Sequence, residues 1–297
     1  MPANSTGNEF TVTLLGTGCP AASERRFGPS ALVQMGGRNI LVDAGSGVTQ
    51  RLAALGLSGA DIDALLITHL HTDHVIDLYQ LIISSWHKSR DRKWMIYGPR
   101  GFNRFVENTM QLWQKERELR IKFEQRTSTV AFDIEVIELN NEEPLEFGEG
   151  LVKPVLVEHK PVVPAWGFSF AYQGRKAVIS GDTRYCENLI HAAQNADLLV
   201  HEVFVHDGME VTGTRTAKGL KAVASYHTLS TEVGQVAAAA NARALCLTHL
   251  VPPDADTTKL ITQAAKSYSG PVIVGEDLMT FDLLTRVARK GEVTFGF

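Results

Sequence analysis

The apolar positions of this chain form many short runs that are typical of β-strands. In the first half, such runs cover residues 10–15, 31–35, 39–42, 64–68 and 94–97. In the second half, they cover residues 134–139, 152–157, 168–172, 176–179, 198–201, 244–248, 271–274 and 279–284. Several of the runs end at Gly or Pro, which interrupt regular structure. We therefore predict strands in both halves of the protein.

Apolar residues at helical spacing separate these runs. They predict helices over residues 48–57, 74–86, 101–120 and 233–240. Clustered strands with helices between them fit two sheets packed face to face with helices outside. We therefore predict an α+β protein with a four-layer αββα sandwich, formed by residues 1–297 as a single domain because no linker divides the chain. Residues 203–219 are weakly apolar, and we predict a surface loop and candidate lid there.

The composition narrows the class of protein. Of the residues, 44% are hydrophobic and 21% charged, as in soluble globular proteins. The net charge of −4 implies no broad basic field, so a nucleic acid partner is disfavoured. No apolar run reaches the ~18 residues of a membrane helix, and the N-terminus lacks a signal-peptide pattern. Three cysteines without motif spacing fit a reducing compartment, so we expect a cytoplasmic protein without membrane contact.

The most informative segment is Thr-His-Leu-His-Thr-Asp-His at residues 68–74, directly after a predicted strand. His69 and His71 can point the same way because alternate residues of an extended chain share a face. Asp73 and His74 begin the next predicted helix and can turn toward a second point. Imidazoles and a carboxylate suit Zn²⁺ or a similar first-row ion. The segment therefore predicts a metal site whose remaining ligands come from elsewhere in the chain.

This segment resembles the HxHxDH signature of the metallo-β-lactamase superfamily. Further segments resemble its ribonuclease Z and arylsulfatase-like branch, namely LGTG at 15–18, RFGPS at 26–30, LVDAG at 41–45, SGDT at 180–183, HE at 201–202 and LTH at 247–249. The closing GEDLM at 275–279 resembles a less characterised group within that branch. The resemblance covers nearly the whole chain and implies the same αββα fold.

The resemblance also implies the ligands of two divalent metal ions. They are His69, His71 and His159 for one ion, Asp73, His74 and His249 for the other, and Asp182 as the bridge. Asp43 is expected to orient the metal-binding loops as a hydrogen-bond acceptor behind the ligands. Zinc is the first expectation for the metal, with manganese or iron as alternatives, because such sites accept all three.

Two metal ions at such a site support hydrolysis. A water between two cations loses its proton near neutral pH, and the hydroxide attacks phosphorus, sulfur or a carbonyl carbon. We count Asp73 as catalytic as well as a ligand. In the ribonuclease Z branch, a Glu in a His-Glu motif pairs with a downstream His that is thought to protonate the leaving alkoxide. Glu202 and His227 resemble this pair.

Candidate substrate contacts lie beside the motifs. Arg184 and Tyr185 follow Asp182, and a cation there would neutralise an anionic substrate. Trp166 either walls the pocket or belongs to the core. Ribonuclease Z holds tRNA with a long arm after the third-motif His, and the segment between His159 and Asp182 is too short for one.

We therefore expect a dinuclear phosphodiesterase that acts on small, anionic ester substrates. The alternatives are an arylsulfatase, a lactonase or another ester hydrolase, and a ribonuclease Z-type tRNA 3′ endonuclease, which the missing arm disfavours. A redox protein is disfavoured because the redox relatives use a flavin domain, which we do not expect in this chain. A degenerate binding module is disfavoured because no ligand of the implied set is missing. We also expect a homodimer, because dimers are common in this branch, with the helices of residues 81–120 as a candidate surface.

Overall fold

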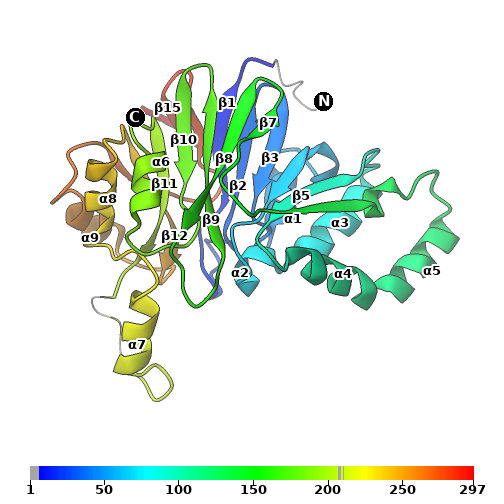
Figure 1. Cartoon of the computed structure of the whole chain (residues 1–297), viewed down its shortest axis with the longest axis horizontal. Helices are drawn as coiled ribbons and strands as arrows, with labels where there is room; N and C mark the ends of the chain where they lie inside the picture. The colour runs from blue at the N-terminus through cyan, green and yellow to red at the C-terminus, as the bar shows by residue number, and fades with distance from the viewer. Residues whose placement is uncertain (1–6, 207–208, 210) are drawn as a thin grey trace.

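Two β-sheets pack face to face in the computed structural model, which describes residues 7–206, 209 and 211–297 (Figure 1). Helices α1 to α4 lie against the outer face of one sheet, and α6, α8 and α9 lie against the outer face of the other (Figure 1). The four-layer αββα prediction is confirmed. No helix in the described part of the chain has the length and apolarity to cross a membrane.

The first sheet has nine strands in the order β16-β15-β14-β1-β2-β3-β4-β5-β6. The strands are β1 (Phe10–Gly16), β2 (Ser30–Met35), β3 (Arg38–Val42), β4 (Ala64–Leu66), β5 (Trp94–Gly98), β6 (Ile134–Glu138), β14 (Thr280–Asp282), β15 (Val287–Lys290) and β16 (Val293–Gly296). Strands β3 to β6 run parallel to one another, so their carboxyl ends share one edge.

The second sheet has seven strands in the order β13-β12-β11-β10-β9-β8-β7. The strands are β7 (Leu145–Phe147), β8 (Gly150–Val157), β9 (Ala165–Tyr172), β10 (Arg175–Ile179), β11 (Leu198–Phe204), β12 (Leu245–Val251) and β13 (Val272–Val274). Strands β10 to β13 are parallel, so their carboxyl ends also share one edge. Functional side chains of α/β sheets gather at such edges.

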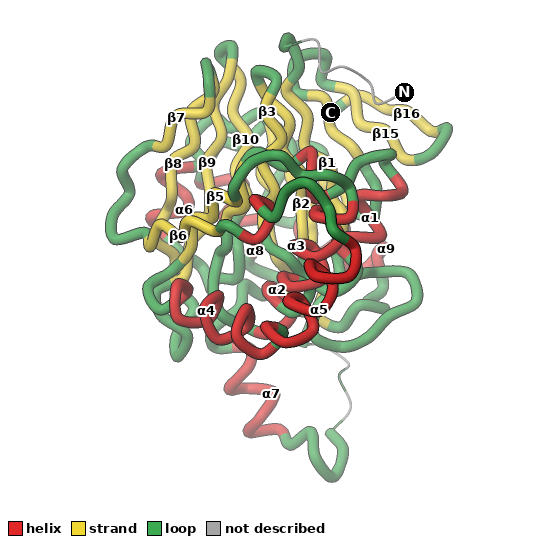
Figure 2. The backbone as a smooth tube through the Cα atoms, turned by 90° about the vertical axis from the view of Figure 1, so that its right-hand side faces the viewer, coloured by secondary structure: helices red, strands yellow, loops and turns green. Residues whose placement is uncertain are grey.

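The helices complete the outer layers. They are α1 (Val48–Ala54), α2 (Thr72–Val75), α3 (Leu78–His87), α4 (Phe102–Leu112), α5 (Gln114–Glu124), α6 (Glu187–Ala192), α7 (Ala217–Ala224), α8 (Val233–Ala239) and α9 (Thr257–Ala264), with short 3₁₀ turns η1 (Gly59–Asp61) and η2 (Val130–Phe132). Helix α7 contains no buried residue and projects from the end of the sandwich (Figure 2).

The core between the sheets consists mainly of side chains that alternate along the strands. Phe10 and Phe281 from the first sheet meet Phe168 and Phe170 from the second, and all four rings are fully buried. Each such ring contributes about 1.5–3 kcal/mol relative to an exposed one. Separate clusters bury the inner faces of the two helical layers.

Three predicted elements need correction. The helix predicted over 74–86 is two helices, α2 and α3. At the break, the Asp77 amide donates a hydrogen bond to the Ala44 carbonyl, and the Asp77 carboxylate accepts one from the Gly47 amide at 2.6 Å. These contacts to the turn after β3 replace helical hydrogen bonds. The helix predicted over 101–120 divides at Trp113. The loop predicted over 203–219 begins inside β11 and ends inside α7, while residues 207, 208 and 210 lie outside the described part.

Candidate metal centre

The carboxyl-end edges of the two sheets bring the predicted ligands together. Asp43 follows β3, and residues 68–74 follow β4 in the first sheet. In the second sheet Asp182 follows β10, whereas Glu202 and His249 lie near the ends of β11 and β12. The sandwich therefore converts widely separated positions of the sequence into one cluster.

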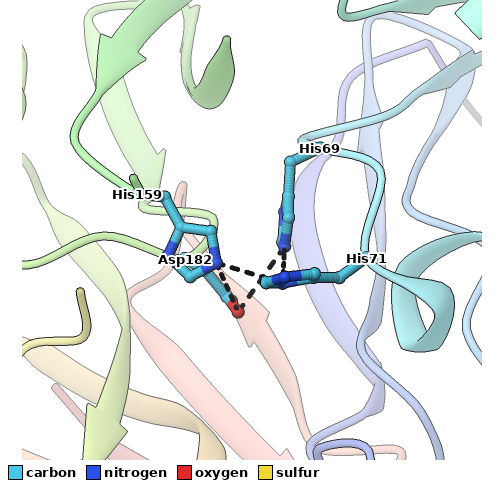
Figure 3. Close-up of side chains that lie close together, drawn as sticks. All are labelled: His69, His71, His159 and Asp182. Atoms are coloured by element: carbon cyan, nitrogen blue, oxygen red, sulfur yellow. Dashed lines mark hydrogen bonds and ion pairs between the residues drawn. The ribbon is translucent and has the colours of Figure 1, made fainter. Parts of the chain in front are cut away.

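One half of the cluster contains three imidazoles and a carboxylate, from His69, His71, His159 and Asp182 (Figure 3). Nδ1 of His71 lies 2.9 Å from Nε2 of His69 and 3.1 Å from Nε2 of His159. Oδ2 of Asp182 lies 3.7 Å from Nε2 of His69 and 3.9 Å from Nε2 of His159. These side chains point toward a common centre (Figure 3).

The other half contains Asp73, His74 and His249. Nε2 of His249 lies 3.2 Å from Oδ2 of Asp73 and 3.3 Å from Oδ2 of Asp182. Nε2 of His74 lies 3.5 Å from Oδ1 of Asp182. The Asp182 carboxylate is therefore shared by the two halves, in the position that a bridging ligand requires.

The cluster fits divalent metal ions by two tests. Protein ligands lie about 2.0–2.2 Å from zinc, so two ligands of one ion lie at most about 4.4 Å apart. The separations above satisfy this limit, and Nε2 of His74 and Oδ1 of Asp182 are buried without a hydrogen-bond partner in the described structure. Buried polar atoms normally have partners. The set therefore suits a binuclear centre, and the role of each residue as a ligand remains a proposal.

Local backbone features aim two of these side chains. His249 is the extra residue of a β-bulge, since Glu202 pairs with Thr248 and Val203 pairs with Leu250. Its φ of 44° is rare for a residue with a Cβ atom, and such strained residues collect at functional sites. Gly181 precedes Asp182 at a φ of 60°, where a Cβ atom would lie 2.4 Å from a backbone oxygen. The chain can therefore turn Asp182 into the cluster only with glycine here.

A second layer of contacts fixes the imidazole rings. Nδ1 of His69 lies 3.0 Å from the Thr68 hydroxyl, and Nδ1 of His159 donates to the Tyr226 carbonyl at 2.9 Å. Nδ1 of His74 lies 2.8 Å from Oδ2 of Asp43. In each of these three rings Nε2 is left to face the cluster, and a partner on the other ring nitrogen is typical of metal-ligating histidines.

The charge states of three imidazoles and of both carboxylates also suit cations. Burial lowers the pKa of His69, His71 and His159, so these rings favour the neutral form that binds metal. Burial alone would raise the pKa of Asp73 and Asp182. The neighbouring imidazoles outweigh that effect and hold both pKa values below the ordinary range. The carboxylates therefore remain charged at neutral pH.

The predicted Glu202–His227 pair lies beside this cluster. Oε1 of Glu202 lies 2.8 Å from Nδ1 of His227, and it accepts the amides of Thr183 and Thr228 at 3.1 and 3.2 Å. Burial lowers the pKa of His227, but the Glu202 charge and hydrogen bond outweigh this and raise that pKa to about 9. The His227 ring stacks 5.8 Å from the His249 ring, so the pair borders the metal site.

The three candidate substrate contacts differ in their surroundings. Nε of Arg184 donates to Glu158 at 2.7 Å, and its side chain is largely exposed. Tyr185 is 39% exposed. Trp166 is buried in the core between the sheets, so of its two predicted roles the structure favours the packing one.

Tyr226 is a site residue that sequence reasoning missed. Its ring centroid lies 5.0 Å from that of His159, 4.8 Å from that of His227 and 6.5 Å from that of His71. The residue has no motif of its own, and only its position directly before His227 could have indicated it.

This fold and this His/Asp cluster together define a metal-dependent hydrolase of the metallo-β-lactamase fold. The chain belongs to the family described as Anti-Pycsar protein Apyc1, whose family model matches residues 10–216. It is also 35% identical over 274 residues to ribonuclease Z of Mycolicibacterium paratuberculosis, covering 90% of this chain and 96% of that protein. Ribonuclease Z of Mycobacterium marinum is 32% identical over 282 residues, covering 93% and 99%. The predicted superfamily and branch are confirmed.

Solved structures share the whole fold. YhfI from Bacillus subtilis, a metallo-β-lactamase fold protein, superposes with a TM-score of 0.72 at 23% identity, covering 93% of this chain and 100% of that one. The short form of human tRNase Z superposes with a TM-score of 0.69 at 25% identity, covering 92% and 99%.

Proposed function

We propose that this protein is a two-metal phosphodiesterase of small phosphodiesters, with cyclic nucleotides as the favoured substrate class. The observation that carries the proposal is the buried Glu202–His227 pair at the border of a binuclear His/Asp cluster. Metal ions alone suffice for esters with good leaving groups, whereas the alkoxide that leaves a natural phosphodiester needs a proton. A fixed acid beside the metal centre meets that need.

The residues divide the work as follows. One ion would be held by His69, His71 and His159. The other ion would be held by Asp73, His74 and His249, and Asp182 would bind both ions. Two divalent ions, zinc in the first place, would supply a deprotonated water at neutral pH and stabilise charge on the phosphoryl oxygens. Asp73 thereby serves catalysis through the metal it would hold.

His227 is the proposed proton donor. Its Nδ1 is engaged by Glu202, so Nε2 is the atom from which a proton can pass to the leaving oxygen. The Glu202 carboxylate is fixed by two backbone amides, and it both orients the ring and favours the protonated form. Glu202 is therefore a positioning residue, and His227 is the catalytic one.

Two observations support a small substrate. Strands β9 and β10 account for most of the segment between His159 and Asp182, which leaves no room there for an RNA-binding arm. The chain also carries a net charge of −4, whereas contacts to many phosphates require a basic surface.

The family model that matches this chain is that of Apyc1, a cyclic nucleotide phosphodiesterase, and this supports cyclic nucleotides as the substrate class.

A ribonuclease Z-type tRNA 3′ endonuclease is the second candidate. It is favoured by the curated relatives of nearly equal length that bear the name ribonuclease Z. The two candidates share the chemistry at phosphorus and differ in what binds around it. We further propose that residues 1–297 act as one catalytic domain and that the protein forms a homodimer.

A substrate panel tests the proposal. Purified, zinc-loaded protein would be assayed with 3′,5′-cyclic nucleotides, bis(p-nitrophenyl) phosphate, a precursor tRNA with a 3′ trailer, an aryl sulfate and a lactone. His69→Ala protein, prepared identically, controls for contaminating enzymes. We expect metal-dependent turnover of the two diesters and none of the precursor tRNA. Efficient tRNA cleavage without cyclic nucleotide turnover would favour the second candidate, and turnover of the sulfate or lactone alone would refute both.

A further inference from the structure

A hollow of about 370 Å³ opens beside Asp73, at the edge of the metal cluster. One wall comes from the loop between β1 and β2, including Cys19, Ala22 and Phe27, and the opposite wall comes from Ile76 between α2 and α3. His159, His227 and Tyr226 do not line it. The hollow therefore adjoins the metal centre without including the proposed proton donor.

The loop wall is held by Asp277, a residue of the closing GEDLM segment to which the proposed chemistry gives no role. Oδ1 of Asp277 accepts the Thr17 amide at 3.0 Å and the Thr17 hydroxyl at 2.8 Å. Oδ2 accepts the Phe27 amide at 2.8 Å. One half-buried carboxylate thus fastens both ends of the loop, so the wall is formed before any ligand arrives.

Packing fixes the Phe27 ring as part of this wall. A Cβ atom at Gly47 would lie 1.8 Å from that ring, so only glycine lets the ring lie flat against the start of α1. The Arg51 guanidinium lies 4.3 Å from the centroid of the Phe27 ring, in cation–π geometry. The loop therefore presents a rigid aromatic side chain next to Asp73.

The residues that line the hollow do not suit a phosphate group in addition to the one at the metal cluster. Arg26 is the one basic residue among the described residues that line the hollow. Its Nε donates to Pro253 O at 3.0 Å, and its Nη1 donates to the Thr17 hydroxyl at 2.7 Å and to Gly275 O at 2.6 Å. Its charge is thus committed to the protein's own oxygens.

The same lining suits a flat, uncharged ring. Ile76 is 60% exposed at the rim of the hollow, so its apolar side chain is available to contact a ligand. Together with Phe27, Ala22 and Cys19 it forms apolar walls around a space that an aromatic ring system can enter. Ligand sites commonly combine such apolar walls with a few polar groups at one end.

We propose that this hollow binds the ring portion of the ester, a nucleobase or aryl group, while the phosphoryl group lies at the metal cluster. The proposal rests on the proposed phosphodiesterase function, and it names the part of the substrate that gives affinity. Asp277 and Arg26 are positioning residues for this subsite, because their polar atoms are bonded to the loop and to neighbouring backbone oxygens.

Binding of two probes to zinc-loaded protein tests the subsite separately from turnover. The probes are adenosine 5′-monophosphate, which carries a ring, and inorganic phosphate, which does not. Isothermal titration of the intact protein should give a Kd for the nucleotide roughly 10-fold below that for phosphate, which is what burial of one ring face supplies. Ala22→Trp, which fills the hollow, and Ile76→Ser, which removes one wall, should each reduce that ratio to near unity.

Matched variants control for indirect effects. Leu119→Ser on α5 replaces another exposed apolar residue far from the hollow and should keep the wild-type ratio. If Ala22→Trp does not fold, Ile76→Ser still decides, because Ile76 is largely exposed. An unchanged ratio in folded Ile76→Ser protein would overturn the subsite, even if the enzyme hydrolyses diesters. Loss of the ratio in a protein that hydrolyses no diester would retain the subsite and refute the proposed function.

Discussion

Nδ1 of His74 lies 2.8 Å from Oδ2 of Asp43, and this contact joins the metal cluster to the turn after β3. Asp43 also accepts the Thr68 amide at 2.8 Å, directly before the first ligand of the HxHxDH segment. Its φ of 62° is rare for aspartate, so surrounding contacts hold it in place. One carboxylate therefore orients both a ligand ring and the start of the ligand-bearing loop.

Replacing this carboxylate should weaken metal binding without removing any ligand. We expect Asp43→Ala to lower zinc affinity by roughly 10–100-fold, as is typical for partners of metal-binding histidines. Competition with a chromophoric chelator measures the change. Asp63→Ala is the control, because Asp63 also accepts a backbone amide in the same sheet but lies away from the cluster. Equal zinc affinity in both variants would contradict the role of Asp43.

Removal of metal should destabilise the protein and abolish turnover. The cluster gathers buried imidazoles around two carboxylates, and ions that bind only the folded state stabilise it by mass action. At a free zinc concentration of about 100 times Kd, one site contributes about 2.7 kcal/mol. We expect elemental analysis to give two ions per chain and thermal unfolding to shift upward on zinc addition. Asp182→Asn, which alters the shared ligand, should reduce that stoichiometry; full retention of both ions would exclude Asp182 as a bridge.

The role of His227 predicts a dependence on the leaving group. His227→Ala should lower kcat for a cyclic nucleotide, whose leaving group is an alkoxide, by about 10²–10⁴-fold. The decrease should be much smaller for bis(p-nitrophenyl) phosphate, since p-nitrophenolate leaves without a proton. Glu202→Gln should show the same pattern with a smaller amplitude, because the ring keeps a hydrogen-bond partner. Steady-state kinetics at equal zinc content measure both effects, and equal losses on the two substrates would refute proton donation.

The sequence was most informative where one segment carries several functional residues. Residues 69–74 supply four proposed ligands within six positions, so their chemistry was recognisable without any fold. His159, Asp182 and His249 follow or lie in three separate strands, and nothing local marks them as neighbours. Only the resemblance to a family placed them in one site. The hollow could not be predicted, because its walls meet through contacts between residues more than 200 positions apart, such as Asp277 with Phe27.

The secondary-structure elements also fall into those that the sequence predicted and those that it did not. Strands with strong apolar runs were predicted to within a few residues, because burial on both faces leaves a clear pattern. The short strands β7, β15 and β16 and the helix α7 were missed, since each carries at most one buried residue. The helices α6 and α9 were also missed. The break between α2 and α3 was missed for another reason. It depends on the contact between Asp77 and Gly47, which no periodicity within residues 74–86 reveals.

Asp277→Asn should loosen the loop that forms the proposed subsite. An amide can accept on one side only, so either the Thr17 donors or the Phe27 amide would face an NH₂ group. A buried donor left without an acceptor costs about 1–3 kcal/mol. We expect lower thermal stability and faster hydrogen exchange in residues 17–28, measured by mass spectrometry. Glu276→Gln is the matched control, since Glu276 is partly exposed and pairs with Lys290 at the surface, where such pairs contribute about 0–1 kcal/mol. If the two variants exchange alike in residues 17–28, the loop is held by something other than Asp277.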